Sequence, residues 1–198
     1  MGNWPTGRQD RPPTPDDPGY QRHALDALGA GRIGWASPVG SAYAGAVHAA
    51  VTVHIDAPPD EVWRLISDIT RMGDYSPEVM EAEWLDGATG PAVGVRYRGH
   101  VKRNEIGPKY WTVCKITECE PGEVFEFVVM LRGRPINRWR YELTPAAGGT
   151  DVTESFDLGD NLWVRIWRPL GGFLRQRRNE RDMRRTLERV KAVAEAST

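Results

Sequence analysis

The chain has 198 residues, a net charge of −1 and eight tryptophans. This length allows one domain with a sizeable core, because about 150 residues bury roughly 70% of their unfolded surface. A nearly neutral chain carries no overall field that would select nucleic acid, so no nucleic-acid partner is expected. The many tryptophans predict a large apolar surface that has to be covered.

The first 46 residues are expected to form a flexible N-terminal extension. The stretch 1–19 is rich in proline, glycine, aspartate and arginine and has no periodicity, which is typical of disorder. No charged segment followed by an apolar one opens the chain, so no secretory signal is indicated. Cys114 and Cys119 lie an odd number of residues apart on one predicted strand, which places them on opposite faces and argues against a disulfide. A reduced, cytoplasmic protein is expected.

From residue 47 onward the pattern predicts one α+β domain. Val51, Val53 and Ile55 alternate with polar residues, as in a half-buried strand, and Pro59–Ile69 has the apolar spacing of a helix that starts at a proline. A second short helical piece is expected to end near Tyr75. Turns rich in glycine and proline separate further predicted strands over 79–85, 93–102, 110–119, 124–131, 137–143 and 152–158. Short turns between consecutive strands indicate an antiparallel meander.

The stretch Gly171–Ala196 is predicted to be one long helix that follows a break at Pro169. Its apolar stripe consists of Phe173, Met183, Leu187, Val190 and Ala194. The stripe is interrupted at Gln176, Arg177 and Glu180, so the first half of the helix is expected to face water, a partner or an internal cavity. We expect the sheet to wrap around this helix and to leave space for an apolar molecule between them.

Alternation along the strands assigns their inward faces. The inward sets are Val95, Tyr97 and Gly99; Trp139, Tyr141 and Leu143; and Val152, Glu154 and Phe156. Glycine within a strand marks a bend or a close approach to the backbone. Strict alternation turns Trp111 outward, whereas a bulge near Gly107–Pro108 would turn it inward. The candidate ligand-binding residues are therefore Tyr75, Tyr97, Gly99, Trp111, Trp139, Tyr141, Glu154, Phe156, Phe173, Gln176 and Glu180.

Glu154 is the first candidate for a catalytic role, and Tyr97, Tyr141 or Glu180 would be the other sources of acid–base help in an enzyme. Glu154 lies on an apolar strand face, where an unpaired carboxylate costs several kcal/mol. Three interpretations are open: it meets an arginine or the open end of the fold, it orients a ligand, or it is a general acid or base with a raised pKa. The four histidines are scattered and no pair has metal-ligand spacing, so neither a metal nor another cofactor is expected.

Arginines dominate the charge of the last helix and the segment before it. The simplest interpretation is a solvated face with ion pairs at helical spacing. The alternatives are an anionic membrane surface, bound through Arg177, Arg178 and Arg181, and a nucleic acid, although no matching motif accompanies the charge.

Several stretches resemble the START-like SRPBCC superfamily, the helix-grip group that includes polyketide cyclase/dehydrase-like and Bet v 1-like proteins. They are the run Val51–Trp63 with its Ala-Pro-Pro-Asp-Glu-Val-Trp ending, Ile66–Ile69, Gly94–Arg98, Trp139–Leu143, Gly149–Glu154 and Met183–Lys191. The resemblance covers about 47–196 and implies a domain over 47–198. It implies a seven-stranded antiparallel sheet that grips the last helix, with two short helices after the first strand and a hydrophobic cavity inside.

The resemblance implies three functions to compare. Members of the superfamily bind lipids, sterols, polyketides, quinones or plant hormones, so a carrier or binding protein for a hydrophobic small molecule is the leading hypothesis. Some members are cyclases, aromatases or dehydratases, which makes a polyketide cyclase/dehydratase without metal or nucleotide cofactor the second. A membrane-surface or protein-interaction module that uses the basic helix is the third. The superfamily has no universal catalytic motif, so no catalytic residue is carried over.

Overall fold

The structure is a computed structural model that describes residues 48–102, 108–158 and 162–197, with side chains from Arg177 onward in the last of these ranges. The extension expected over 1–46 lies outside the described residues.

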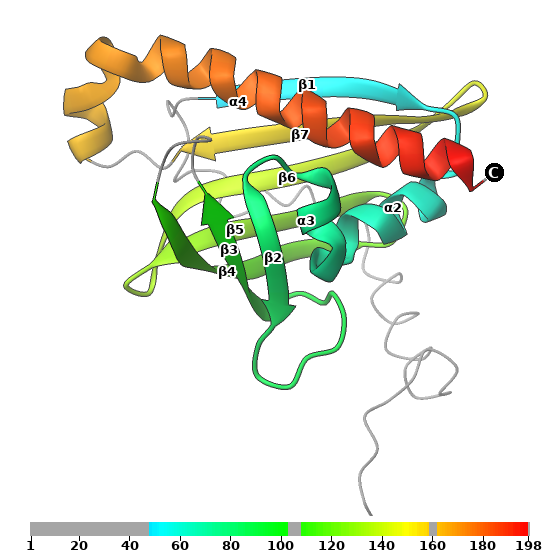
Figure 1. Cartoon of the computed structure of the whole chain (residues 1–198), viewed down its shortest axis with the longest axis horizontal. Helices are drawn as coiled ribbons and strands as arrows, with labels where there is room; N and C mark the ends of the chain where they lie inside the picture. Colours follow the sequence, from blue (N-terminus) through cyan, green and yellow to red (C-terminus); the bar gives the residue numbers. More distant parts are fainter. Residues whose placement is uncertain (1–47, 103–107, 159–161, 198) are drawn as a thin grey trace, which may run out of the picture. The chain divides into compact units, whose positions relative to one another are not determined.

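A seven-stranded antiparallel sheet is the centre of the fold (Figure 1). Its strands are β1 (His48–Ile55), β2 (Val79–Trp84), β3 (Arg96–Lys102), β4 (Lys109–Glu120), β5 (Val124–Leu131), β6 (Arg134–Ala146) and β7 (Gly149–Leu158). The strand order is β1-β7-β6-β5-β4-β3-β2, so β2 to β7 form a meander and β1 pairs with the last strand. This arrangement confirms the predicted α+β helix-grip fold.

Short helices carry the chain from β1 at one edge of the sheet to β2 at the other. They are α2 (Pro59–Ser67), the 3₁₀ turn η2 (Ile69–Arg71) and α3 (Met72–Tyr75). Proline opens α2, where a missing N–H has no consequence, and acidic residues occupy its first turn. The Asp68 side chain accepts a hydrogen bond from the Thr70 backbone N–H (3.1 Å) and so starts the next turn. The two predicted helical pieces are therefore present.

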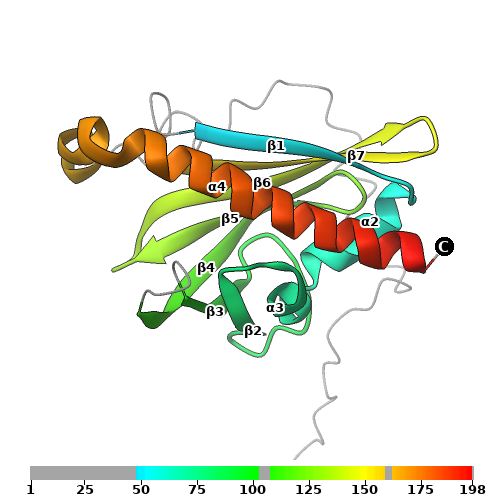
Figure 2. The ribbon, with the colours of Figure 1, turned by 45° about the horizontal axis from the view of Figure 1, so that its top comes forward.

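The last helix, α4 (Leu162–Ala196), is longer than predicted. The prediction started it at Gly171, but the helix continues through Pro169 and the glycines after it. A proline inside a helix removes one hydrogen bond and bends the axis without necessarily ending the helix. The ribbon of α4 turns sharply near its N-terminal end, and the straight remainder crosses the concave face of the sheet (Figures 1 and 2).

The straight part of α4 closes the hydrophobic core. Met183, Leu187, Val190 and Ala194 are buried, as the predicted apolar stripe requires, whereas the side chain of Phe173 lies outside the described residues. They belong to one core cluster with the inward side chains of β1, which are Ala49, Val51, Val53 and Ile55. Val62 and Ile66 of α2 join the same cluster. The helix is thus anchored over β1 and α2 rather than over the centre of the meander.

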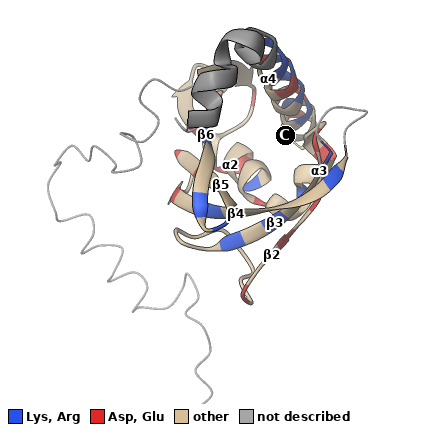
Figure 3. Cartoon of the chain, turned by 90° about the vertical axis from the view of Figure 1, so that its left-hand side faces the viewer, with Lys and Arg blue, Asp and Glu red and all other residues tan. Residues whose placement is uncertain are grey.

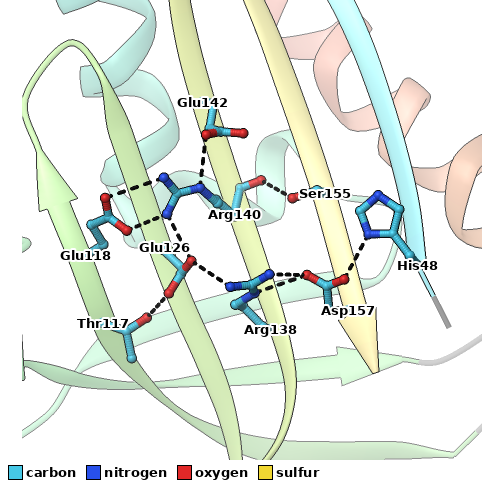
Figure 4. A network of polar contacts seen from close by, with 9 residues as sticks. All are labelled: His48, Thr117, Glu118, Glu126, Arg138, Arg140, Glu142, Ser155 and Asp157. Atoms are coloured by element: carbon cyan, nitrogen blue, oxygen red, sulfur yellow. Dashed lines mark hydrogen bonds and ion pairs between the residues drawn. The ribbon is translucent and has the colours of Figure 1, made fainter. Parts of the chain in front are cut away.

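The outer face of the sheet carries a polar network instead of a second layer of apolar side chains (Figure 4). Arg140 donates to Glu126 (3.0 Å) and also bonds Glu118. Arg138 donates to Asp157 (2.6 Å), which in turn is bonded to His48 (2.8 Å). The Glu126 side chain is only 4% exposed, so its charge depends on these partners.

Candidate functional site

A cavity of about 190 Å³ lies between α4 and the inner face of the meander. Strands β2 to β7, residues 76–78 and the helix all contribute to its wall. The space is larger than an engineered protein cavity of about 150 Å³ that accepts benzene. Most of the wall is apolar, with the side chains of Ile69, Met72, Val79, Ala82, Val101, Phe127, Val129, Ile136, Trp139 and Met183.

Aromatic side chains hold the shape of this wall. The Tyr97 ring meets Trp84 and Phe127 edge to face, with ring centroids 6.0 and 5.5 Å apart. Trp139 lies against Phe156, with 4.7 Å between the centroids. Edge-to-face and tilted contacts of this kind are favourable and directional. The wall is therefore packed from behind, and a guest would meet positioned aromatic surfaces.

Glu154 is a buried acid in the cavity wall. It is 3% exposed, and its Oε1 accepts a hydrogen bond from the Tyr141 hydroxyl (2.8 Å). Its Oε2 has no hydrogen-bond partner among the described residues. Burial raises the pKa of Glu154 from an ordinary 4.5 to about 8, although the Tyr141 bond acts in the opposite direction. The carboxyl is thus mostly protonated at neutral pH.

The interpretation that Glu154 meets an arginine is wrong for the described part of the chain. Its nearest polar partner is Tyr141, whose own pKa is raised well above 10 by burial, so the phenol keeps its proton and donates it. Arg138 and Arg140 belong to the same strand as Tyr141, but alternation turns them to the outer face. At 3% exposure Glu154 does not lie at an open end of the fold either, so an orienting group and a general acid or base are the interpretations left.

Two further polar side chains of the wall, Asn137 and Cys114, differ in the contacts that they can make with a ligand. Asn137 is 5% exposed, and its Oδ1 has no partner in the described structure. Burial raises the pKa of the Cys114 thiol to about 11, so this cysteine remains a protonated thiol. The amide is a possible contact for a ligand, whereas the cysteine is not an activated nucleophile.

Five of the predicted site residues line the cavity together: Tyr97, Gly99, Trp139, Tyr141 and Glu154. Strand alternation predicts that these residues face inward. Their contact with a ligand stays a prediction. Gly99 has room around it, because an added Cβ would meet nothing closer than Thr112 Oγ1 at 3.7 Å. The side chains of Phe173 and Gln176 lie outside the described residues.

Three other predicted residues lie near the cavity but do not form its wall. Phe156 is buried behind Trp139. Tyr75 is 1% exposed within the core, and the Arg189 guanidinium donates to its backbone carbonyl (3.2 Å). Glu180 is partly exposed on α4, outside the set of residues that line the space. The first two support the site from behind.

Trp111 is not a cavity residue, contrary to its place among the candidates. It is 45% exposed on the outer face, where its ring stacks on His100 with 4.7 Å between the centroids. The Arg98 guanidinium lies 4.6 Å from the centre of the same ring. The irregularity in β4 falls between Ile116 and Glu118, which is on the far side of Cys114 from Trp111. Strict alternation therefore holds at Trp111 and turns it outward.

Replacing Trp111 by alanine is expected to leave the affinity for any cavity ligand unchanged within a factor of about two. The free energy of unfolding should fall by about 1 kcal/mol, because an exposed stacking and cation–π contact is lost while the core stays intact. Urea denaturation and equilibrium dialysis of the variant measure both. A loss of affinity of tenfold or more would place Trp111 back in the site.

Some wall residues were not among the candidates. Asn137 shares strand parity with Trp139 and Tyr141, so alternation alone could have found it. Thr112 and Cys114 have the opposite parity to Trp111, the candidate on β4, and line the cavity in its place. Asn179 and Asp182 of α4 also line the cavity, the first within the interruption of the apolar stripe and the second just after it. The packing of α4 against β1 and α2 fixes which of these polar side chains look into the cavity.

The arginines proposed for a membrane surface are partly used within the helix. Arg181 approaches Asp182 at 3.1 Å and Arg178 approaches the same carboxylate at 4.0 Å. Acidic residues are interspersed among more numerous basic ones along the described part of α4 (Figure 3). These contacts agree with a solvated helix face that carries ion pairs. They do not support binding to an anionic membrane surface, which stays a prediction.

The described part of the chain contains no helix with enough length and hydropathy to cross a bilayer. It also contains no group of three His, Cys, Asp or Glu side chains placed to hold a metal ion.

Comparisons with known proteins agree with this geometry. The sequence model of a protein family described as "Polyketide cyclase / dehydrase and lipid transport" matches residues 46–195. A polyketide cyclase-like protein from Corynebacterium glutamicum is 25% identical, with 77% of this chain and 93% of that chain covered and a TM-score of 0.55. The Zhui aromatase/cyclase from Streptomyces sp. R1128 is 17% identical, with 75% and 93% covered and a TM-score of 0.57.

A START superfamily protein from Mycobacterium smegmatis shares the fold at lower identity. It is 13% identical, with 76% of this chain and 99% of that chain covered and a TM-score of 0.59. No curated protein matches the sequence. The family match extends from just before β1 almost to the end of α4, so it includes every described element. The chain belongs to the polyketide cyclase / dehydrase and lipid transport family.

Proposed function

We propose that the protein binds an apolar small molecule in the cavity between its sheet and α4, as a carrier or binding protein. The observation that carries the proposal is the cavity of about 190 Å³ with a mostly apolar, partly aromatic wall. A lipid, a polyketide or a quinone-like molecule has the required chemistry. The family description, which names lipid transport beside cyclases and dehydrases, supports the same class of ligand.

Burial of apolar surface supplies the affinity. Each 100 Å² of ligand surface removed from water contributes about 2.5 kcal/mol before the loss of ligand freedom is subtracted. A few polar groups then set the orientation, as is usual for ligand pockets. Tyr141 with Glu154, Asn137 and Thr112 are among the polar groups of this wall.

Thermal unfolding with a panel of apolar compounds tests the proposal, together with native mass spectrometry of the purified full chain. We expect a compound to co-purify, or at least one panel member to raise Tm by several degrees, because a ligand that binds only the folded state stabilises it. If no compound co-purifies and no panel member shifts Tm at its solubility limit, the proposal is wrong.

Filling the cavity gives a sharper prediction. Gly99→Leu is expected to weaken binding of an apolar panel compound at least tenfold, because the new side chain enters the cavity that Gly99 lines. Stability should not fall, since Gly99 lies in a strand interior and a Cβ there makes only ordinary contacts. Lys115→Leu, on the exposed face of the neighbouring strand, is the matched control and should bind normally. Equal affinities of the two variants would contradict the cavity as the binding site.

A second candidate function is catalysis of a cyclisation or dehydration in the same cavity. The protonated Glu154 beside Tyr141 favours it, because a carboxylic acid with a pKa of about 8 can give a proton to a substrate oxygen at neutral pH. A shaped cavity that folds a flexible substrate would supply the rest. Glu154→Gln should then reduce turnover of a polyketide substrate at least 100-fold while its Kd changes little. Unchanged turnover in the variant would remove Glu154 from the mechanism.

A further inference from the structure

We infer that the cavity selects an uncharged amphiphile whose hydroxyl or carbonyl oxygen meets Glu154, and that it discriminates against organic anions of the same size. The inference rests on the proposed function, since it names the chemistry of the ligand that the cavity would hold. It is carried by the hydrogen-bonding state of Glu154 and by the charges of the wall.

The carboxyl of Glu154 has one hydrogen-bonding position left for a guest. Tyr141 occupies Oε1 (2.8 Å), while Oε2 is buried in the wall without a partner among the described residues. A buried polar group without a partner is unfavourable. A hydrogen bond between a ligand oxygen and Oε2 therefore contributes more binding free energy than the same bond at an exposed site. Burial also keeps this carboxyl mostly protonated at neutral pH, which makes Oε2 a donor. A hydroxyl or carbonyl oxygen can accept from it.

The charges of the wall decide against an anion. Three of its residues carry carboxyl groups, namely Glu78, Glu154 and Asp182, and none of its described residues is Lys, Arg or His. The arginines near Asp182 approach the helix carboxylate itself and are not part of the cavity wall. An anionic ligand would lose its hydration and meet no cation among the described residues of this wall. The free energy of one hydrogen bond from Glu154 is smaller than the free energy that the anion loses on desolvation.

Asn137 carries the other unpaired oxygen among the described residues of the wall, and it lies far from Glu154. Tyr141 is the strand partner of Glu154, and Asn137 lies four residues from Tyr141 on β6. Four residues of an extended strand span about 13 Å, so a compact probe reaches one group and not both. A two-ring probe bound at Glu154 therefore makes no contact with Asn137, and a variant of Glu154 shows which of the two groups the probe meets.

A matched set of three probes tests the inference: 2-naphthylmethanol, 2-methylnaphthalene and 2-naphthoate. They share the ring system and differ in carrying a hydroxyl, no polar group or a negative charge. Equilibrium dialysis against the full chain at pH 6 measures their Kd values, because the carboxyl of Glu154 is protonated at that pH while naphthoate is ionised. We expect the alcohol to bind about tenfold more tightly than the hydrocarbon, and naphthoate to bind most weakly.

Three variants separate the role of Glu154 from a general effect on the fold. Glu154→Met should bind the alcohol and the hydrocarbon equally, because it removes the donor at similar volume. Glu154→Gln still offers a donor and should keep at least part of the preference. Glu142→Met makes the same change on the outer face, at a half-exposed glutamate, and should keep the whole preference.

The outcomes distinguish a failure of this inference from a failure of the proposed function. A preference for the alcohol that is lost in Glu154→Met supports the inference. Equal binding of the alcohol and the hydrocarbon by the unaltered protein, or tightest binding of naphthoate, overturns it and leaves the cavity as an unselective apolar site. If none of the three probes binds and no larger apolar compound shifts Tm, the proposed function fails and the inference fails with it.

Discussion

Glu154→Gln is expected to raise the free energy of unfolding at pH 7 by about 3 kcal/mol. In the folded protein the pKa of this carboxyl is about 8, whereas its ordinary value is 4.5. An unfolded chain therefore gains from ionising Glu154 at neutral pH, and the folded chain does not. Glutamine keeps the shape and can still accept the Tyr141 hydrogen bond, but it has no proton to release. The variant should thus be more stable than the original protein.

The sign of the pH dependence follows from the same two pKa values. Below pH 4.5 the carboxyl is protonated in both states, so the stability of the fold is unaffected by it. Between about pH 4.5 and 8 the unfolded state binds fewer protons than the folded state, and stability is lost as the pH rises. Urea denaturation at pH 5, 7 and 8 should show this fall in the original protein and a flatter profile in Glu154→Gln.

A surface variant provides the control for this measurement. Glu142 lies on the outer face with its side chain 51% exposed and 3.2 Å from Arg140. Glu142→Gln should change the free energy of unfolding by less than about 1 kcal/mol, because exposed ion pairs contribute little. The gain in free energy of unfolding from Glu154→Gln should be larger at pH 7 than at pH 5. If the gain is the same at both pH values, the carboxyl of Glu154 ionises normally and its proposed role as a donor is wrong.

Arg140→Met is expected to lower the free energy of unfolding by about 3 kcal/mol. The substitution removes the guanidinium that bonds Glu126 and Glu118 on the outer face. Glu126 then keeps Arg138 at 3.6 Å and the Thr117 hydroxyl at 2.7 Å, but it stays 4% exposed with less compensation for its charge. Breaking a buried pair from one side is unfavourable for this reason.

The double variant shows whether the buried charge causes this loss. Arg140→Met together with Glu126→Gln should recover at least 1 kcal/mol relative to Arg140→Met alone, since no unpaired charge is left behind. Urea denaturation of the four proteins at pH 7 gives the coupling energy. If the double variant loses the sum of the two single losses, the two side chains act independently and the network in Figure 4 does not act as a unit.

Strand alternation made much of the fold and part of the site predictable. The inward positions of Tyr97, Trp139 and Tyr141 follow from parity alone, because successive side chains on a strand point to opposite faces. The glycine and proline turns then separate the strands, and short turns require antiparallel neighbours. A buried acid at Glu154 could be recognised in the same way, since it was the odd polar member of an apolar face.

The remainder of the site depends on tertiary packing. The Trp111 prediction turned on where β4 is irregular, and only the pairing of β4 with β5 places that irregularity between Ile116 and Glu118. The predicted start of α4 was wrong because the helix runs through Pro169, and a proline can bend a helix without ending it. The tyrosine that bonds Glu154 lies 13 positions before it in the chain, and the strand register between β6 and β7 brings the two together.

Nuclear Overhauser effects between the protein and bound 2-methylnaphthalene test the central claim most directly. The compound has no polar group, so it reports only on whether the space between the sheet and α4 accepts an apolar guest. We predict contacts from its ring protons to the Met183 methyl group and to the indole of Trp139, both of which line the cavity. Contacts confined to the outer-face Trp111, or a saturating guest without contacts to Met183 and Trp139, would contradict the account.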